Sequence, residues 1–284
     1  MKRKGALCVT AGLALGLAGV AAAVPASASS GVYVALGDSY TSGPLITPAA
    51  SGANILCLQS AANYPHLTAA ALGLSLTDVS CAGATVSDMT TSQYSGVAPQ
   101  FDALSSSDTV VSIGIGGNDN NTFIDAIAAC SALGALDVLN IGAPCKAAEG
   151  STFANDIASD GPNVGAALAE IHTLAPNARV FVVGYPDILP QRGNCWLSMP
   201  LTTGDVAYLN GVEQDLNSML ATEAAAHGAT FVDTFDGSIG HDLCKSESVR
   251  WIEPLIPSSA AISVHPNANG EAYMASALEA AING

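Results

Sequence analysis

Four residues far apart in the chain could together carry out nucleophilic catalysis. Ser39 follows a short apolar stretch, Val32 to Leu36, and a hydroxyl at the end of a strand becomes a nucleophile when a base reaches it. Gly83 leaves its backbone N–H uncovered by any side chain, and Asn118 carries an amide N–H₂, so both could donate to a developing negative charge. His265 would supply the base.

Each of these residues also has an ordinary structural interpretation. Ser39 and Thr41 could simply cap a following helix, and Gly83 could be a turn glycine. Asn118 or Asp119 could be the N-cap of the helix predicted next in the chain. A dinucleotide-binding loop is disfavoured at this place, because the Gly-x-Gly-x-x-Gly spacing is absent.

His265 has a setting that the other histidines lack. Pro266 pushes it toward extended geometry, and Asn267 can cap a last helix over 268–280, so the imidazole is held just ahead of a helix on a non-helical backbone. The remaining histidines are His66, His172, His227 and His241. We therefore take His265 as the candidate base.

The elements that must position these residues alternate between strand and helix. Short β-forming runs are predicted at 32–36, 74–79, 109–113, 179–183 and 229–232. Helices are predicted at 65–72, 122–130, 151–174, 203–227 and 268–280, with a short one near Phe101 and a loop over 131–150. This alternation predicts an α/β fold with a parallel sheet and helices on both faces, in which Ser39, Gly83 and Asn118 follow strands one, two and three.

The first residues form a predicted signal peptide. A basic start precedes the apolar stretch 5–24, and Ala26 to Ala28 offers a small-residue cleavage site, so we expect cleavage after Ala28; Ala21 to Ala23 is a second candidate. A membrane anchor is disfavoured, because the stretch is rich in Gly and Ala and is followed by that site. We expect residues 29–284 to form a single secreted domain without stable membrane insertion, and to be monomeric.

Charge and cysteine content narrow the function classes. The formal net charge is −16, and removing a leader with three basic residues and no acid gives −19, so nucleic acid and anionic membranes are poor partners.

Six cysteines remain after the leader, an even number that indicates disulfides in an exported chain. Six cysteines allow fifteen pairings, and we expect neighbours to pair: Cys57 with Cys81, Cys130 with Cys145, and Cys195 with Cys244. A zinc site is disfavoured, since no Cys-x-x-Cys or His-x-x-x-His spacing is present.

Four short motifs together resemble a known family. They are Gly37-Asp38-Ser39-Tyr40, Cys81-Ala82-Gly83-Ala84, Gly116-Gly117-Asn118-Asp119 and His265-Pro266-Asn267. Each is weak alone, but their order and spacing closely resemble the SGNH (GDSL-type) hydrolases, and most of all the secreted actinobacterial lipases and phospholipases A of that family. The resemblance implies a flavodoxin-like three-layer α/β/α sandwich with a five-stranded parallel sheet and an esterase that uses no cofactor or metal.

The resemblance also implies a role for each motif residue. Ser39 would be the nucleophile and His265 its general base, and the backbone N–H groups of Ser39 and Gly83 with the Asn118 side chain would form the oxyanion hole. Many members place an aspartate three residues before the histidine, where this chain has Ile262. We expect a Ser–His dyad whose imidazole donates to a backbone carbonyl, at Ile262 or Ser263. Asp242 reaching in from its own loop is the less favoured alternative.

The substrate is the least constrained part of the prediction. Apolar loops over 189–201 and 251–256 could wall an acyl-chain groove, or could instead pack as core under the disulfides. Aromatic residues are few, which disfavours sugar-stacking platforms. We expect an ester substrate of the lipid class, with fatty-acyl chains. The alternatives are a carbohydrate O-deacetylase and a non-catalytic, ligand-binding relative.

Overall fold

The structure, a computed structural model, describes residue 5 and residues 31–284. The predicted signal peptide and its cleavage site after Ala28 lie outside the described residues, apart from Gly5. Within the described part of the chain, no helix is both long and apolar enough to cross a membrane.

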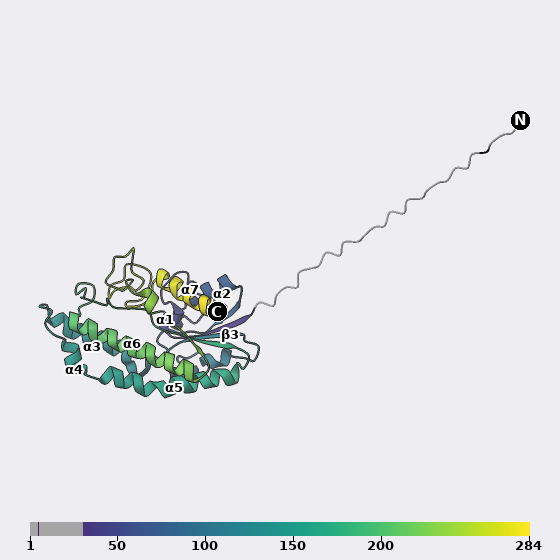
Figure 1. Cartoon of the computed structure of the whole chain (residues 1–284), viewed down its shortest axis with the longest axis horizontal. Coiled ribbons are helices and arrows are strands. Elements are labelled where there is room, and N and C mark those ends of the chain that lie inside the picture. Colours follow the sequence, from purple (N-terminus) through teal and green to yellow (C-terminus); the bar gives the residue numbers. More distant parts are fainter. Residues whose placement is uncertain (1–4, 6–30) are drawn as a thin grey trace.

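Five parallel strands form one sheet in the order β2-β1-β3-β4-β5, and helices cover both of its faces (Figure 1). The strands are β1 (Val32–Gly37), β2 (Ser75–Asp78), β3 (Val110–Gly114), β4 (Arg179–Val183) and β5 (Thr230–Val232). The inner strands are buried on both sides, which explains why they appear in the sequence as continuous apolar runs. The predicted α/β sandwich with a five-stranded parallel sheet is confirmed.

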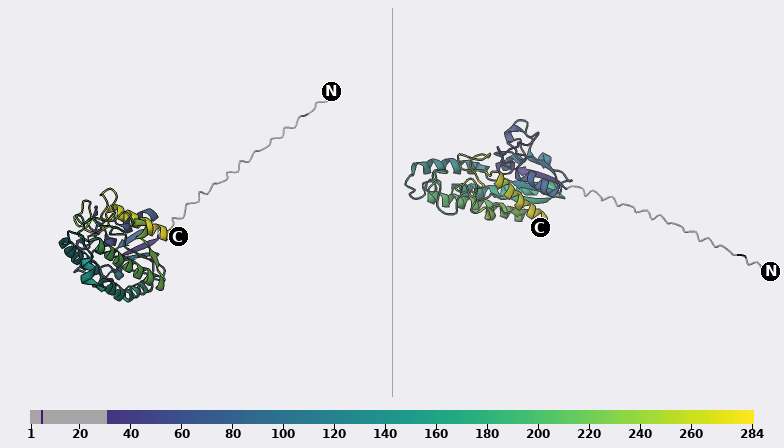
Figure 2. Two further views of the ribbon diagram at one scale, coloured as in Figure 1. Left: turned by 60° about the vertical axis from the view of Figure 1, so that its left-hand side comes forward. Right: turned by 90° about the horizontal axis from the view of Figure 1, so that it is seen from above.

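The helices divide into two layers. They are α1 (Ser39–Ser42), α2 (Tyr64–Leu72), α3 (Thr122–Leu136), α4 (Pro144–Glu149), α5 (Thr152–Leu174), α6 (Thr203–Ala226) and α7 (Ala268–Asn283). Helices α2 and α7 pack together on one face, while α3, α5 and α6 cover the other, as both views of Figure 2 show. Short 3₁₀ helices lie at Ile55–Cys57, Val86–Met89, Gln100–Ala103, Asp119–Asn121 and Asp236–Ser238.

Successive residues of β1 point to opposite layers. Tyr33 and Ala35 pack with α2 and α7, and Val34 and Leu36 pack with the other layer. The chain order reverses beside β1, whose neighbours are β2 and β3. Ligands of open α/β sheets bind outside the carboxyl ends of strands at such a reversal, which is where β1 and β3 deliver Ser39 and Asn118.

The region between the third strand and α5 is more helical than expected. The prediction of a loop over 131–150 is wrong: α3 continues to Leu136, and the short helix α4 follows from Pro144. Ala and Leu residues favour that extension. Gly134 lies inside the helix although glycine weakens helices, because the Cβ of any other residue there would collide with the carbonyl of Pro200. Glycine at 134 therefore allows a close approach to the loop before α6, and does not end the helix.

Candidate active site

The nucleophile candidate stands at the start of a four-residue helix. Asp38 is the N-cap of α1, and its Oδ1 accepts a hydrogen bond of 2.8 Å from the Tyr40 backbone N–H. Ser39 is therefore the first helical residue and not the cap, and its side chain is largely buried. The carbonyl of Gly114, at the end of β3, accepts from the Asp38 N–H at 2.9 Å and ties this turn to the neighbouring strand.

Ser39 and His265 lie within hydrogen-bond distance although 226 residues separate them. The Ser39 Oγ is 2.7 Å from Nε2 of His265, and Nδ1 of the same ring is 2.8 Å from the carbonyl oxygen of Ser263. A carbonyl can only accept, so Nδ1 carries the proton and Nε2 is left free to accept from the serine. Burial lowers the pKa of His265 to about 4, which the Ser263 hydrogen bond opposes only in part.

Two carboxylates near the histidine in sequence do not touch its ring. Asp242 accepts from the Cys244 N–H at 2.9 Å and lies 3.4 Å from the Lys245 ammonium. Glu253 pairs with Arg250, with Nη2 and Oε2 separated by 2.9 Å. Of the two carbonyls proposed for the imidazole, the structure places that of Ser263, and not that of Ile262, at Nδ1.

Glu253 holds the backbone of the histidine loop. Its N–H donates to the His265 carbonyl, and its own carbonyl accepts from the Val264 N–H, each at 2.9 Å. Val264 has a φ of 61°, a left-handed conformation that is costly for a β-branched residue. Burial alone would raise the pKa of Glu253, but hydrogen bonds from Arg250, from Asn267 and from two serine N–H groups bring it down to about 2. A buried ionised pair therefore fixes the strand-like segment on which His265 is mounted.

The proposed oxyanion-hole residues come from the turns after β2 and β3. Gly83 has a φ of 80°, a conformation that favours glycine, and the nearest atom to a Cβ built there would be Nε2 of Gln93, at 3.6 Å. Asn118 donates one amide hydrogen to the Ala84 carbonyl at 3.0 Å, which leaves its second N–H for another acceptor. The Asp119 side chain accepts from the Val86 N–H at 3.0 Å and does not cap α3. The side chains of Asn118 and Asp119 therefore both bond to the backbone just after Gly83.

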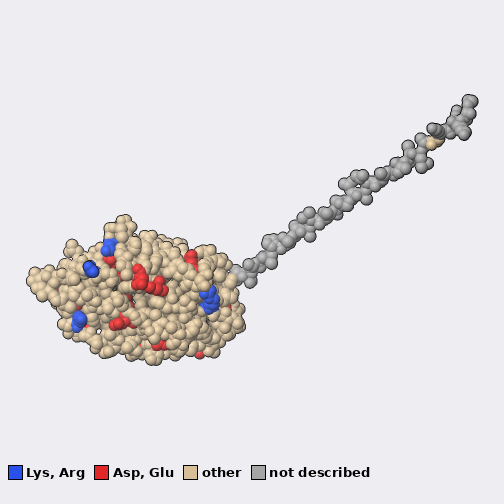
Figure 3. Space-filling view, viewed as in Figure 1, with Lys and Arg blue, Asp and Glu red and all other residues tan. Residues whose placement is uncertain are grey.

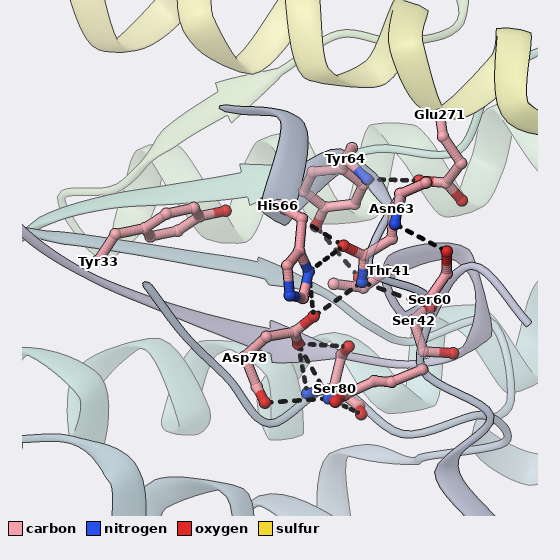
Figure 4. Close-up of polar contacts among 12 residues, drawn as sticks. Tyr33, Thr41, Ser42, Ser60, Asn63, Tyr64, His66, Asp78, Ser80 and Glu271 are labelled. Atoms are coloured by element: carbon pink, nitrogen blue, oxygen red, sulfur yellow. Dashed lines mark hydrogen bonds and ion pairs between the residues drawn. The ribbon is translucent and has the colours of Figure 1, made fainter. Parts of the chain in front are cut away.

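A buried polar network supports the nucleophile turn from the side of α2 and α7 (Figure 4). The hydroxyls of Thr41 and Tyr64 are 3.1 Å apart, and the Tyr64 N–H donates to Oε2 of Glu271 at 2.7 Å. Asp78, the last residue of β2, accepts from Asn63 at 2.7 Å and from the Ser80 hydroxyl at 2.6 Å. Tyr64 of α2 thus contacts α1 directly, while Glu271 of α7 and Asp78 of β2 hold the start of α2 in place.

Two residues that sequence reasoning missed also contact the nucleophile motif. The Tyr185 hydroxyl donates to Oδ2 of Asp38 at 2.6 Å and accepts from the Gly117 N–H at 2.9 Å, so one phenol joins the first and third motifs. Burial raises the pKa of Asp38 to about 7, although hydrogen bonds from Tyr185 and Tyr40 oppose that shift. Gln100 bonds both the N–H and the carbonyl of Gly37, at 2.7 and 2.9 Å. In the sequence, Tyr185 could have been recognised as a site residue only by its position just after the end of the fourth strand.

Tyr40 touches both halves of the dyad. Its N–H bonds to Asp38 beside the serine, and its hydroxyl donates to the Val264 carbonyl at 2.6 Å. The Tyr40 and His265 ring centroids are 4.8 Å apart, and Phe123 meets the same imidazole edge-on at 5.5 Å. These aromatic rings bury the imidazole and exclude water from it, consistent with its lowered pKa.

An apolar pocket begins beside the dyad and runs between α3, α5 and α6. Its lining includes Phe123, whose ring meets the His265 imidazole, and Tyr185, whose hydroxyl bonds Asp38. Ile157, Leu189 and Leu216 also line it. Glu213 of α6 also lines it, and burial, reinforced by nearby Asp187, raises the pKa of Glu213 well above its usual range. Burial thus disfavours the charged form of this acid, and the remaining lining is mostly apolar, as suits a hydrocarbon group.

The two apolar loops predicted to wall a groove are divided between several roles. Ile188 and Leu189 line the pocket, whereas Met199, Leu201 and Ile252 are core residues. Trp251 stacks between the rings of His241 and Tyr273, and Leu197 and Ile256 are exposed. The pocket is built mainly from helices, so the expectation that these loops form it is right only for its rim.

Three disulfides join each cysteine of residues 31–284 to its neighbour in sequence: Cys57–Cys81, Cys130–Cys145 and Cys195–Cys244. The zinc alternative is therefore excluded for these six thiols. The first bridge links the loop after α1 to the turn that carries Gly83, so it lies between two of the four sequence motifs.

Known proteins share the sequence and the fold around this geometry. Residues 35–273 match the model of the GDSL-like Lipase/Acylhydrolase family. The chain is 47% identical to Lipase 2 of Streptomyces coelicolor over 268 residues, covering 93% of this chain and 90% of the relative. It is also similar to the crystal structure of phospholipase A1 from Streptomyces albidoflavus NA297, with a TM-score of 0.74 and 30% identity over 89% of this chain and 99% of the other.

The extracellular lipase of Streptomyces rimosus is equally similar, with a TM-score of 0.73 and 30% identity over 89% of this chain and 100% of that one. The family match extends from the nucleophile strand into the helix after the histidine, so it includes every motif of the site. The chain thus belongs to the GDSL-like lipase/acylhydrolase family, and it is a hydrolase of carboxylic esters of lipids.

Proposed function

We propose that this protein is exported, and that it hydrolyses fatty-acyl esters of lipids as a monomer through an acyl-enzyme on Ser39. The observation that carries the proposal is the 2.7 Å contact between the Ser39 hydroxyl and Nε2 of His265, in the tautomer that accepts a proton. The three disulfides support export, because disulfides persist in oxidising compartments.

The first half of the reaction transfers the acyl group to the enzyme. Nε2 of His265 takes the proton of Ser39 as its oxygen attacks the ester carbonyl carbon, and the carbonyl oxygen becomes an oxyanion. The backbone N–H groups of Ser39 and Gly83 and the free amide hydrogen of Asn118 donate to that oxyanion. The imidazolium then gives its proton to the leaving alcohol oxygen as the C–O bond breaks.

Water completes the cycle by the same steps. His265 removes a proton from water as it attacks the acyl carbon, and returns that proton to the Ser39 oxygen as the fatty acid leaves. The Ser263 carbonyl holds the ring in the productive tautomer. Because this acceptor is neutral, it stabilises the imidazolium less than a carboxylate would.

The apolar pocket favours a lipid acyl chain over an acetyl group. It lies beside the dyad and is lined mostly by hydrocarbon and aromatic side chains, with Thr122 and Glu213 as exceptions, and burial disfavours the charged form of Glu213. Apolar burial stabilises a bound chain by about 0.8 kcal/mol for each methylene that enters. We therefore expect kcat/KM to rise with chain length until the pocket is filled, which a carbohydrate O-deacetylase would not show.

Profiling acyl-chain length on soluble nitrophenyl esters tests the proposal, with wild type compared to Ser39→Ala. The matched control is Ser42→Ala, since Ser42 is a buried serine of the same short helix whose Oγ has no hydrogen-bond partner. We expect Ser39→Ala to lose at least about 10³-fold in kcat and all labelling by a fluorophosphonate, and Ser42→Ala to retain both.

Three results would contradict the proposal. Labelling that persists in Ser39→Ala would place the nucleophile elsewhere. A profile that peaks at acetyl esters would favour the deacetylase, and an absence of hydrolysis in wild type would favour the non-catalytic relative.

A further inference from the structure

Six large aliphatic side chains on three neighbouring segments are exposed to solvent. We call Leu136, Val138, Leu139, Ile141, Leu197 and Ile256 the apolar tip; each is between 66% and 94% exposed. Leu136 ends α3, and Val138, Leu139 and Ile141 belong to the connection between α3 and α4, which forms the left end of the molecule in Figure 1. The same end shows neither Lys, Arg, Asp nor Glu at its extremity in Figure 3.

Hydrogen bonds join the three segments that carry the apolar tip. The indole N–H of Trp196, next to Leu197, donates to the Gly134 carbonyl at 2.9 Å, two residues before Leu136. The Leu255 N–H, next to Ile256, donates to the Ser198 carbonyl at 3.4 Å. The three segments are therefore neighbours in the fold, and the Ser263 hydroxyl, which donates to the Leu255 carbonyl, joins them to the histidine loop.

The connection between α3 and α4 uses its polar side chains internally and exposes its apolar ones. Asp137 accepts from the Ile141 N–H at 3.1 Å, which closes the turn. Oδ1 of Asn140 accepts from the Thr203 N–H at 2.7 Å, which fastens the turn to the start of α6. Apolar residues normally avoid such positions, and a contiguous exposed apolar patch marks an interaction site.

We infer that the apolar tip docks on a surface of neutral or zwitterionic lipid. Protein interfaces are enriched in Tyr, Trp and Arg at their centres, whereas the exposed side chains here are all aliphatic. Segments 136–141, 194–198 and 255–257 contain one charged residue, Asp137, so they offer no cations for anionic headgroups. The net charge of −16 further disfavours an anionic membrane.

One helix joins the apolar tip to the acyl pocket. Helix α3 carries Phe123, Ala126 and Ile127 on the acyl pocket and ends at Leu136 in the tip. A lipid surface bound at the tip lies at the far end of the helix that walls the pocket. This inference rests on the proposed lipid substrate, but it concerns binding to an aggregate and not the chemical step.

Vesicle binding tests the inference separately from hydrolysis. In a Ser39→Ala background, partitioning onto phosphatidylcholine vesicles is compared between the parent and the double variant Leu139→Ser/Leu197→Ser. The control is Ile55→Ser/Leu56→Ser, which removes two exposed aliphatic residues from a different loop. We expect the tip variant to lose about tenfold or more in partitioning and the control to stay within about twofold. In the protein that retains Ser39, we expect both double variants to keep kcat/KM on a soluble butyrate ester within about twofold of the parent.

Three results would overturn the inference. The first is that the tip variant binds vesicles as well as its parent does. The second is that the parent prefers phosphatidylglycerol vesicles. The third is that the parent sediments as a dimer and the tip variant as a monomer. Vesicle binding that persists although wild type hydrolyses no ester would leave the docking surface standing and reject the proposed function.

Discussion

The serine and the histidine of the site are held in different ways. The Ser39 turn is fixed by side chains, among them Asp38, Tyr185, Gln100 and the pair of Thr41 and Tyr64. The His265 loop is fixed by groups close to it in sequence: its ring donates to the Ser263 carbonyl, and its peptide groups bond to those of Glu253, whose carboxylate pairs with Arg250. The serine side therefore depends on side chains from distant parts of the chain, which the motif itself does not reveal, whereas the histidine side is held largely by its own neighbourhood.

The largest effect is expected from removing the base. His265→Gln keeps a polar side chain but cannot take up a proton, so we expect kcat/KM on a soluble ester to fall by at least about 10³-fold. His241→Gln is the matched control in the same region, since His241 stacks on Trp251 and contacts no proposed catalytic residue. A loss below tenfold for His265→Gln would mean that another group acts as base.

The histidine side should also be sensitive to the buried ion pair beneath it. Arg250→Met leaves the Glu253 carboxylate buried and unpaired, and we expect the free energy of unfolding to drop by about 3 kcal/mol at pH 7. The folded-state pKa of Glu253, about 2, lies below its unfolded value, so the stability it contributes is present above pH 4.3 and is lost as pH falls toward 2. Urea unfolding at pH 7 and pH 3 should show the gap between wild type and variant narrowing; an equal gap would contradict this account.

The pH profile tests the burial of the imidazole. The pKa of His265 is lowered to about 4, so the ring stays neutral and able to act as a base down to that pH. We expect the acid limb of kcat/KM near pH 4, whereas an imidazole with the ordinary pKa of about 6.5 would already have lost about 30-fold at pH 5. A limb close to pH 6.5 would show that water reaches the ring in solution.

On the serine side, Tyr185→Phe removes the hydroxyl that joins Asp38 to Gly117 and leaves the ring in place. Asp38 then loses a partner, and we expect kcat to fall by about tenfold with KM little changed. Fluorophosphonate labelling should slow in proportion. An unchanged labelling rate would show that the network supports folding alone.

The smallest effect is expected at the residue that orients the imidazole. Ser263→Ala keeps the carbonyl that accepts from Nδ1 and removes only a hydroxyl bonded to Leu255, so kcat/KM should stay within about threefold. A loss approaching that of His265→Gln would mean that the side chain, and not the backbone, supports the base.

Much of the fold was predictable from the sequence. Five apolar runs predicted five parallel strands, and Pro266 and Asn267 marked the start of the last helix, whose Asn267 side chain caps the N–H groups of Asn269 and Gly270. The extension of α3 through Gly134 was missed, because the reason for that glycine is a close approach of the distant Pro200 carbonyl. A single sequence shows a glycine but not the neighbour that requires it.

The candidate site was predictable where chemistry follows a strand end. Ser39, Gly83 and Asn118 were selected on that basis and His265 for its setting before Pro266 and Asn267, and the structure brings Ser39 and His265 into contact. Their catalytic roles remain predictions. Tyr185 and Gln100 were missed because a tyrosine and a glutamine carry no catalytic signal by themselves, and their value arises only from tertiary contacts with Asp38 and Gly37.

Tyr40, the neighbour of the nucleophile, has a consequence for how this enzyme can vary. Its backbone N–H bonds beside the serine, and its hydroxyl bonds beneath the histidine. Substitutions at opposite ends of the chain therefore share one intermediary and should combine non-additively, whereas sites without a common partner act independently. Epistasis in a mutational survey would then concentrate on residue 40.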